Sequence, residues 1–91
     1  MNEDFIPFEL LCKLREKGYH YEGRHIYDVL KWLREEKKIH ISIDIWGRTW
    51  GYDILNLPSG NSLHWTAYDE NINNYEKAAI AGISYYSDNL I

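Results

Sequence analysis

The chain has 91 residues, a formal net charge of −4, a pI near 5.5 and an apolar content of 45%. This length predicts a single domain over residues 1–91, with a real but thin core. The acidic balance disfavours non-specific attraction to nucleic acid or anionic lipid. The single cysteine, Cys12, allows no internal disulfide, the first residues are acidic and no apolar run approaches a membrane span. We therefore expect a cytoplasmic protein without membrane contact.

Two helices are expected in the first half of the chain. The first runs from Pro7 to Lys17, because Pro suits the first helical position and Gly18 suits the left-handed residue after the last turn. Its apolar arc consists of Phe8, Leu10, Leu11, Cys12 and Leu14. The second runs from Ile26 to about Lys38, with His25 as a poor residue at the N-cap position.

Three strands follow. The clearest is Ile39 to Trp46, in which four isoleucines alternate with other residues, as in a half-buried strand. Gly47-Arg48 favours a two-residue hairpin turn. Further strands are expected over 49–57 and 62–68, joined by a turn at 58–61 that contains Pro, Ser, Gly and Asn.

The last helix is expected from Tyr75 to about Asn89, with Asn74 as its cap. Gly82 lies on its apolar side and would allow a close approach to the sheet. The complete packing face is predicted to comprise Tyr75, Ala79, Gly82, Ile83, Tyr86 and Leu90.

The two turns predict a strand register that hydrophobic alternation also favours. It pairs Ile43 with Tyr52 and Ile54 with Trp65 on one apolar face, where the helices should pack. The opposite face then carries a row of three side chains: His40, Leu55 and His64. The expected fold class is α+β, in the order α-α-β-β-β-α, with a three-stranded antiparallel meander and its helices on one face. Ile43 is expected in the core.

No motif for catalysis is present, whether a glycine-rich phosphate loop, a nucleophile elbow or a pair of catalytic carboxylates. Cys12 lies on an apolar helical arc, where a free cysteine is usually a small buried hydrophobe. His40, Asp53 and His64 suggest a metal site, but strands two apart separate the histidine backbones by about 9.6 Å, too far for easy sharing of one zinc ion. We therefore expect no catalytic residue, no metal, no cofactor and no enzymatic activity.

The helix-free face is the candidate surface for function. Trp46, Leu55 and Tyr68 are large apolar groups predicted to lie among its polar residues, as interface hot spots often do. The expected function is non-catalytic binding of an unknown protein partner or of a second copy as a homodimer. The plainer alternative is that the connection from Tyr19 to Arg24, or the N-terminal segment, folds over these residues and buries them.

A basic flank of the second helix gives an alternative function, nucleic-acid binding. Glu35 and Glu36 dilute its positive field, and a solvated helix face is the simpler interpretation, so nucleic acid is the less favoured partner. The flank consists of Arg24, Lys31, Trp32, Arg34 and Lys38.

Three stretches carry a family resemblance: the run from Lys31-Trp32-Leu33-Arg34 through Ile39-His40-Ile41, the opening from Phe5-Ile6-Pro7 through Gly18-Tyr19, and the closing from Tyr75-Glu76-Lys77-Ala78 through Asn89-Leu90-Ile91. Together they resemble a family of short, uncharacterised proteins of gut Bacteroides and their phages. The family has no established activity, so the resemblance implies no functional residue. This sequence has His25 where the relatives place a Thr cap.

Two further likenesses concern topology alone. From Ile26 onward, the order of helix, three strands and helix is similar to that of double-stranded-RNA-binding domains. Those domains carry several lysines at the start of the final helix, where this sequence has only Lys77 beside Glu76. Three strands followed by a helix also resemble the antitoxin half of some bacterial toxin–antitoxin pairs. A shared fold does not by itself imply a shared function.

Overall fold

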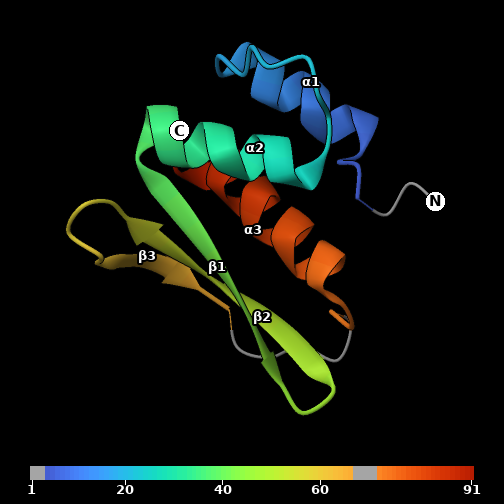
Figure 1. Ribbon diagram of the computed structural model, residues 1–91, viewed down its shortest axis with the longest axis vertical. Coiled ribbons are helices and arrows are strands. Elements are labelled where there is room, and N and C mark those ends of the chain that lie inside the picture. Colours follow the sequence, from blue (N-terminus) through green and yellow to red (C-terminus); the bar gives the residue numbers. More distant parts are fainter. Residues whose placement is uncertain (1–3, 67–71) are drawn as a thin grey trace.

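The structure is a computed structural model that describes residues 4–66 and 72–91, with the backbone alone at Trp46. The α+β class, the element order and the three-stranded antiparallel sheet are confirmed (Figure 1). The elements are α1 (Phe8–Glu16), α2 (Ile26–Trp32), the π-helical segment η1 (Leu33–Lys37), β1 (Ile39–Trp46), β2 (Thr49–Asn56), β3 (Ser62–Trp65) and α3 (Tyr75–Asn89).

Helix α1 is one residue shorter than predicted at each end, because Pro7 is its extended N-cap and Lys17 its C-cap; Gly18 follows with the expected positive φ, 104°. Its buried residues are Leu10 and Leu14. Phe8 and Cys12, which were expected on the packing face, are exposed. The reason is the position of α1 on the outer side of the helical layer, where it buries a narrower stripe than its apolar arc (Figure 1).

Helix α2 continues directly into η1, and together they span the predicted second helix. The π-helical turn was not predicted, and it ends at Lys38, whose φ of 57° is left-handed. Trp32 is 0% exposed and packs edge to face with the buried ring of Tyr19 at 5.2 Å between ring centroids. The connection between α1 and α2 therefore covers a flank of α2 that lies outside the apolar stripe of this helix.

The pairing of β1 with β2 follows the predicted register, including Ile43 opposite Tyr52. Helix α3 packs on the isoleucine face of these two strands (Figure 1). Gly82 allows the close approach, because a Cβ there would lie 2.9 Å from Cγ2 of Ile41. The predicted cap is also present, since the side chain of Asn74 accepts a hydrogen bond from the backbone N–H of Lys77 at 2.8 Å.

The predicted register of β3 is wrong by one residue. Trp65 was expected opposite Ile54, but His64 occupies that position and Trp65 lies opposite Asp53. A slip of one residue moves every side chain of a strand to the other face. His64 therefore lies on the helix-covered face, where its ring stacks on Tyr85 at 3.6 Å, and the predicted row of His40, Leu55 and His64 does not form.

Two local features cause this slip. The backbone N–H of Asn56 donates to the carbonyl oxygen of Asn61 at 2.8 Å. The loop between β2 and β3 therefore begins directly after Asn56, one residue before the predicted turn at 58–61. Ser62 then lies opposite Leu55, and the next pair skips Leu63. This extra residue is a β-bulge, which changes the alternation of the strand.

The core lies between the sheet and the helices, and it thins along β1. Ile39 and Ile41 are buried, Ile43 is half-buried rather than in the core as predicted, and Ile45 is 54% exposed. The β1–β2 hairpin thus extends past the helical cover (Figure 1). The buried cluster also includes Ile6, Leu10, Leu14, Tyr19, Ile26, Val29, Leu30, Trp32, Leu33, Tyr52, Ile54, Ala79, Ile83 and Tyr86.

Candidate functional site

The sheet face opposite α3, here called the open face, carries a large exposed aromatic side chain. Trp65 is 63% exposed and lies opposite Asp53, while Leu55, two residues further along β2, is half-buried. The hydroxyl of Ser62 donates to the Asp53 carboxylate at 2.6 Å. A shallow hollow of about 240 Å³ beside the indole is lined by Asp44, Gly51, Tyr52, Asp53, Trp65 and Thr66. Such a mixture of an exposed aromatic and polar neighbours suits a protein contact.

Of the three predicted surface residues, the structure describes the side chain of Leu55 alone. Leu55 lies on the open face, paired with His40 as predicted. Trp46 pairs with Thr49 through its backbone, but its side chain and the whole of Tyr68 lie outside the described residues. Sequence reasoning missed Trp65, because the alternation of the third strand had placed it on the core face.

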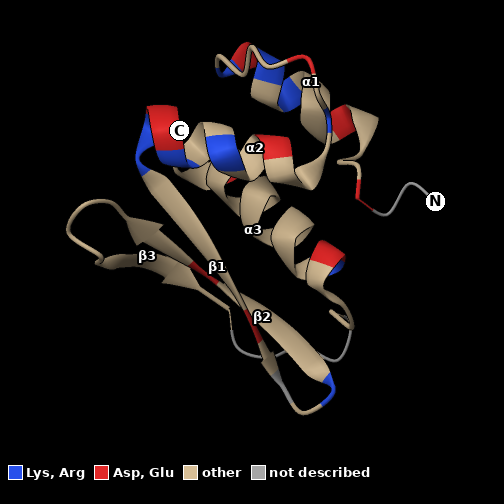
Figure 2. Cartoon of the chain, viewed as in Figure 1, with Lys and Arg blue, Asp and Glu red and all other residues tan. Residues whose placement is uncertain are grey.

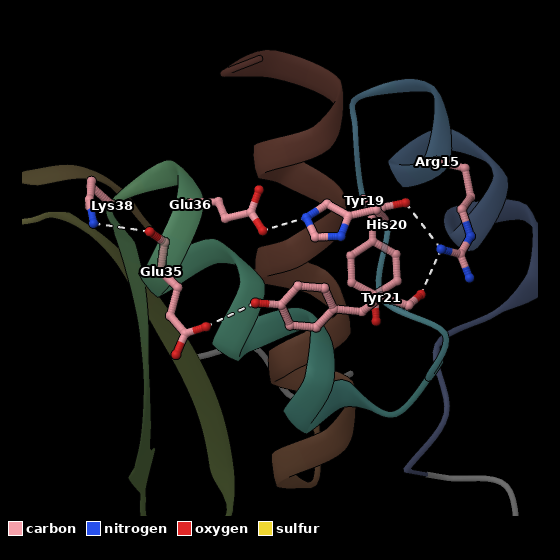
Figure 3. Close-up of polar contacts among 7 residues, drawn as sticks. All are labelled: Arg15, Tyr19, His20, Tyr21, Glu35, Glu36 and Lys38. Carbon is pink, nitrogen blue, oxygen red and sulfur yellow. Dashed lines mark hydrogen bonds and ion pairs between the residues drawn. The ribbon is translucent and has the colours of Figure 1, made fainter.

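The connection from residue 19 to residue 24 does not cross the open face. It lies along η1 instead, where the hydroxyl of Tyr21 donates to the Glu35 carboxylate at 2.9 Å and His20 pairs with Glu36 (Figure 3). The hydrogen bond to the carboxylate raises the pKa of Tyr21 above its ordinary value. This half of the plainer alternative, in which the connection buries the candidate surface, is therefore wrong.

The N-terminal segment also lies elsewhere. Phe5 forms a backbone bridge with His25, and the N–H of Ile6 donates to the carbonyl oxygen of Arg24 at 2.9 Å. The described part of this segment thus packs beside the start of α2, on the helical side of the molecule.

The basic flank of α2 is not assembled as the nucleic-acid alternative requires. Trp32 is buried, so its ring is not available to stack on a base. The guanidinium of Arg24 donates to the carbonyl oxygen of Ile6 at 2.8 Å and lies over the ring of Phe5. Positive and negative side chains are mixed along α2 and η1 (Figure 2). The remaining cations of the flank are Lys31, Arg34 and Lys38.

A groove of about 390 Å³ separates the N-terminal segment from the start of α3, and its lining residues are Phe5, Ile6, Pro7, Arg24, Asn74, Glu76, Lys77 and Ile80. The groove contains charges of both signs, since Glu76 is acidic and Arg24 and Lys77 are basic. Two of its polar groups already have partners, since Arg24 binds the Ile6 carbonyl and Asn74 caps α3. The groove therefore does not define a charged ligand site.

Within residues 4–66 and 72–91, no group of three or more His, Cys, Asp or Glu side chains could hold a metal ion. The two histidines of the considered metal site, His40 and His64, lie on opposite faces of the sheet. Cys12 is exposed on α1, far along the chain from both.

The outer edge of β1 has a regular backbone pattern. Along β2, Trp50 and Asn56 donate backbone N–H groups away from β1, to the carbonyls of Ile72 and Asn61. Because pairs in an antiparallel ladder alternate, the residues opposite the even-numbered positions of β2 turn their N–H and C=O groups away from it. These residues are the four isoleucines, Ile39, Ile41, Ile43 and Ile45.

That edge receives no backbone hydrogen bond from other described segments, and its exposed part is the end of β1, since Ile39 and Ile41 are buried and Ile45 is exposed. β1 also has no Pro, no Lys and no bulge, the devices that usually protect an edge strand. The other edge strand, β3, has only four residues and carries the bulge.

None of the described helices is long and apolar enough to cross a membrane. The chain was also compared with known proteins, and no protein-family model, curated protein or solved structure matches it.

Proposed function

We propose that the chain is a non-catalytic protein-binding domain whose contact surface is the open face of the sheet. The observation that supports this proposal is the exposure of Trp65, at 63%, on the face that the described helices leave uncovered. Tryptophan at the centre of a desolvated contact is among the residues that contribute most to binding between proteins. Leu55 is a further apolar residue on the same face, and Asp53, which lies opposite Trp65 and accepts a hydrogen bond from Ser62, supplies a polar group.

The surface follows from how the sheet is built. The helices cover the isoleucine face, so the other face is left to solvent or to a partner. On that face Trp65 is the residue of the type that contributes most when a protein contact buries it. The exposed indole is therefore the group whose removal should affect binding most.

The test replaces Trp65 and Leu55 with serine and uses Tyr27→Ser as the matched control. Tyr27 is 64% exposed but lies on α2, away from the open face. Each tagged protein is used to capture partners from cells of the native host, and its solution mass and thermal stability are measured. The proposal expects the double variant to lose the captured partner and keep its fold, while Tyr27→Ser keeps both. If the double variant unfolds, or binds as the wild type does, the open face is not the contact surface.

A further inference from the structure

We infer that a second copy of this chain binds along the outer edge of β1, so that two three-stranded sheets join into one six-stranded sheet. The inference rests on the proposed function in one respect, since it names a partner for a protein-binding domain. It uses a different part of the molecule, however: the edge of the sheet rather than its open face.

The backbone pattern of the edge carries the first step. Ile41, Ile43 and Ile45 present N–H and C=O groups outward at every second residue, which is the spacing that an added antiparallel strand requires. Pairing from Ile39 to Ile45 of each copy would form four hydrogen-bonded pairs and about eight hydrogen bonds, since each such pair exchanges two. A strand of identical sequence satisfies this pattern around a two-fold axis.

Side-chain complementarity selects the register. Outward groups belong to odd-numbered residues, so these must pair with odd-numbered residues of the other strand. When Ser42 lies on the two-fold axis, His40 of one copy faces Asp44 of the other, and the reverse pair forms by symmetry. Side chains in such non-hydrogen-bonded pairs approach most closely, so two contacts between an imidazole and a carboxylate result.

The same register also covers an exposed apolar residue. Ile45 is 54% exposed because the helical cover ends before it. In the dimer, Ile45 of one copy lies beside Ile39 of the other, which is buried under the helical layer. The row of isoleucines would thus continue across the interface, whereas in a monomer it ends in solvent.

The first experiment measures the mass of the purified chain in solution over a range of concentrations, by light scattering and sedimentation. The expected wild-type mass is twice the 10.9 kDa of one chain. Ile45→Lys should give a folded monomer, because in this register its ammonium group would lie beside the buried, apolar Ile39 of the other copy. The control is Phe8→Lys, which places the same charge at a residue that is 66% exposed on α1, and it should stay dimeric.

The second experiment tests the register by exchanging charges. His40→Asp places two carboxylates opposite one another twice in the dimer and should weaken association by roughly tenfold. Adding Asp44→Lys restores opposite charges across the interface and should recover most of the affinity. Within one chain these residues are four apart on the same strand, about 13 Å, and do not pair, so only a contact between copies explains such a recovery.

Three outcomes would overturn the inference: a monomeric wild type up to several hundred micromolar, a dimer that Ile45→Lys leaves intact, or a failure of the double charge variant to recover. None of them bears on Trp65, because the capture experiment tests the open face separately. Loss of partner capture in the Trp65 variant together with an unchanged dimer would, in turn, separate the two surfaces.

Discussion

Gly82→Ala tests the packing of α3 on the sheet. In an exposed helix interior this change stabilises a protein by about 1 kcal/mol, because alanine has the higher helix propensity. Here the added methyl group would lie 2.9 Å from Cγ2 of Ile41 and 3.2 Å from two ring atoms of Tyr52. Both neighbours are buried, and the branched side chain of Ile41 has little freedom to move.

Overpacking of a close-packed core typically costs about 1–3 kcal/mol, so the clash should exceed the propensity gain. We expect a net loss of up to about 2 kcal/mol, against a total stability of roughly 5–15 kcal/mol for a domain of this kind. Urea unfolding followed by circular dichroism measures this difference in unfolding free energy. If this free energy depends on urea concentration with the same slope in both proteins, the mutation has not changed the compactness of the folded or the unfolded state.

Two controls make the result specific. Ser84→Ala, on the same helix, should gain up to about 0.5 kcal/mol from propensity alone. In an Ile41→Ala background, which removes the nearest methyl group, Gly82→Ala should cost less than in the wild type. If Gly82→Ala stabilises the protein, α3 does not approach the sheet this closely and the packing argument is wrong.

Three further measurements test the core, the cap and the response to alkali. Ile54→Ala should cost about 2–5 kcal/mol because the side chain is fully buried, whereas Ile43→Ala, at a half-buried site, should cost less than about 2 kcal/mol, and equal losses would contradict the thinning of the core along β1. Asn74→Ala should cost about 1 kcal/mol through the lost cap on α3, and a change below about 0.3 kcal/mol would mean that the side chain does not cap the helix in solution. Burial raises the pKa of Tyr19 to about 12, so the folded chain holds a proton that the unfolded chain releases near pH 10. The contribution of Tyr19 to stability should therefore be complete below pH 10 and be lost as the pH rises from 10 to 12. Tyr19→Phe should make the fall of stability in this range shallower in chemical unfolding, and an equally steep fall would place its phenol in solvent.

The β1–β2 hairpin could be predicted from the sequence because short-range signals determine it. Gly47 adopts the positive φ of 63° that the two-residue turn needs, which sets the register, and the alternation of the four isoleucines indicates which face of β1 packs toward the helices. Both signals lie within 18 residues, so no distant part of the chain has to be known. The capped start of α3 is predictable for the same reason.

The register of β3 could not be predicted because two loop closures fit the same turn residues. Closure through Asn56 and Asn61, followed by the bulge at Leu63, differs by one residue from the closure that the turn composition suggested. Apolar residues at alternate positions of β3 favoured the wrong face. The position of Trp65, and with it the candidate surface, follows from this local detail of the loop.

The burial of Trp32 was also not accessible from the sequence. A helical wheel places it on the flank of α2, but the connection that carries Tyr19 returns from α1 and covers that flank. Apolar residues at helical spacing show which side of a helix packs against the core. They do not show which other segment of the chain covers the neighbouring side.

The uneven helical cover of the sheet has a consequence for local opening. His40 and Ser42 direct their N–H groups to β2 beside the buried Ile39 and Ile41, under η1 and α3, so their amide protons should exchange with solvent only when the whole domain unfolds. Around Gly47, beyond Ile45, few buried contacts resist opening, and the turn can separate while the core remains intact. The free energy of amide exchange should therefore fall along the hairpin from its root to its tip, so that one ladder contains both the most and some of the least protected amides of the sheet.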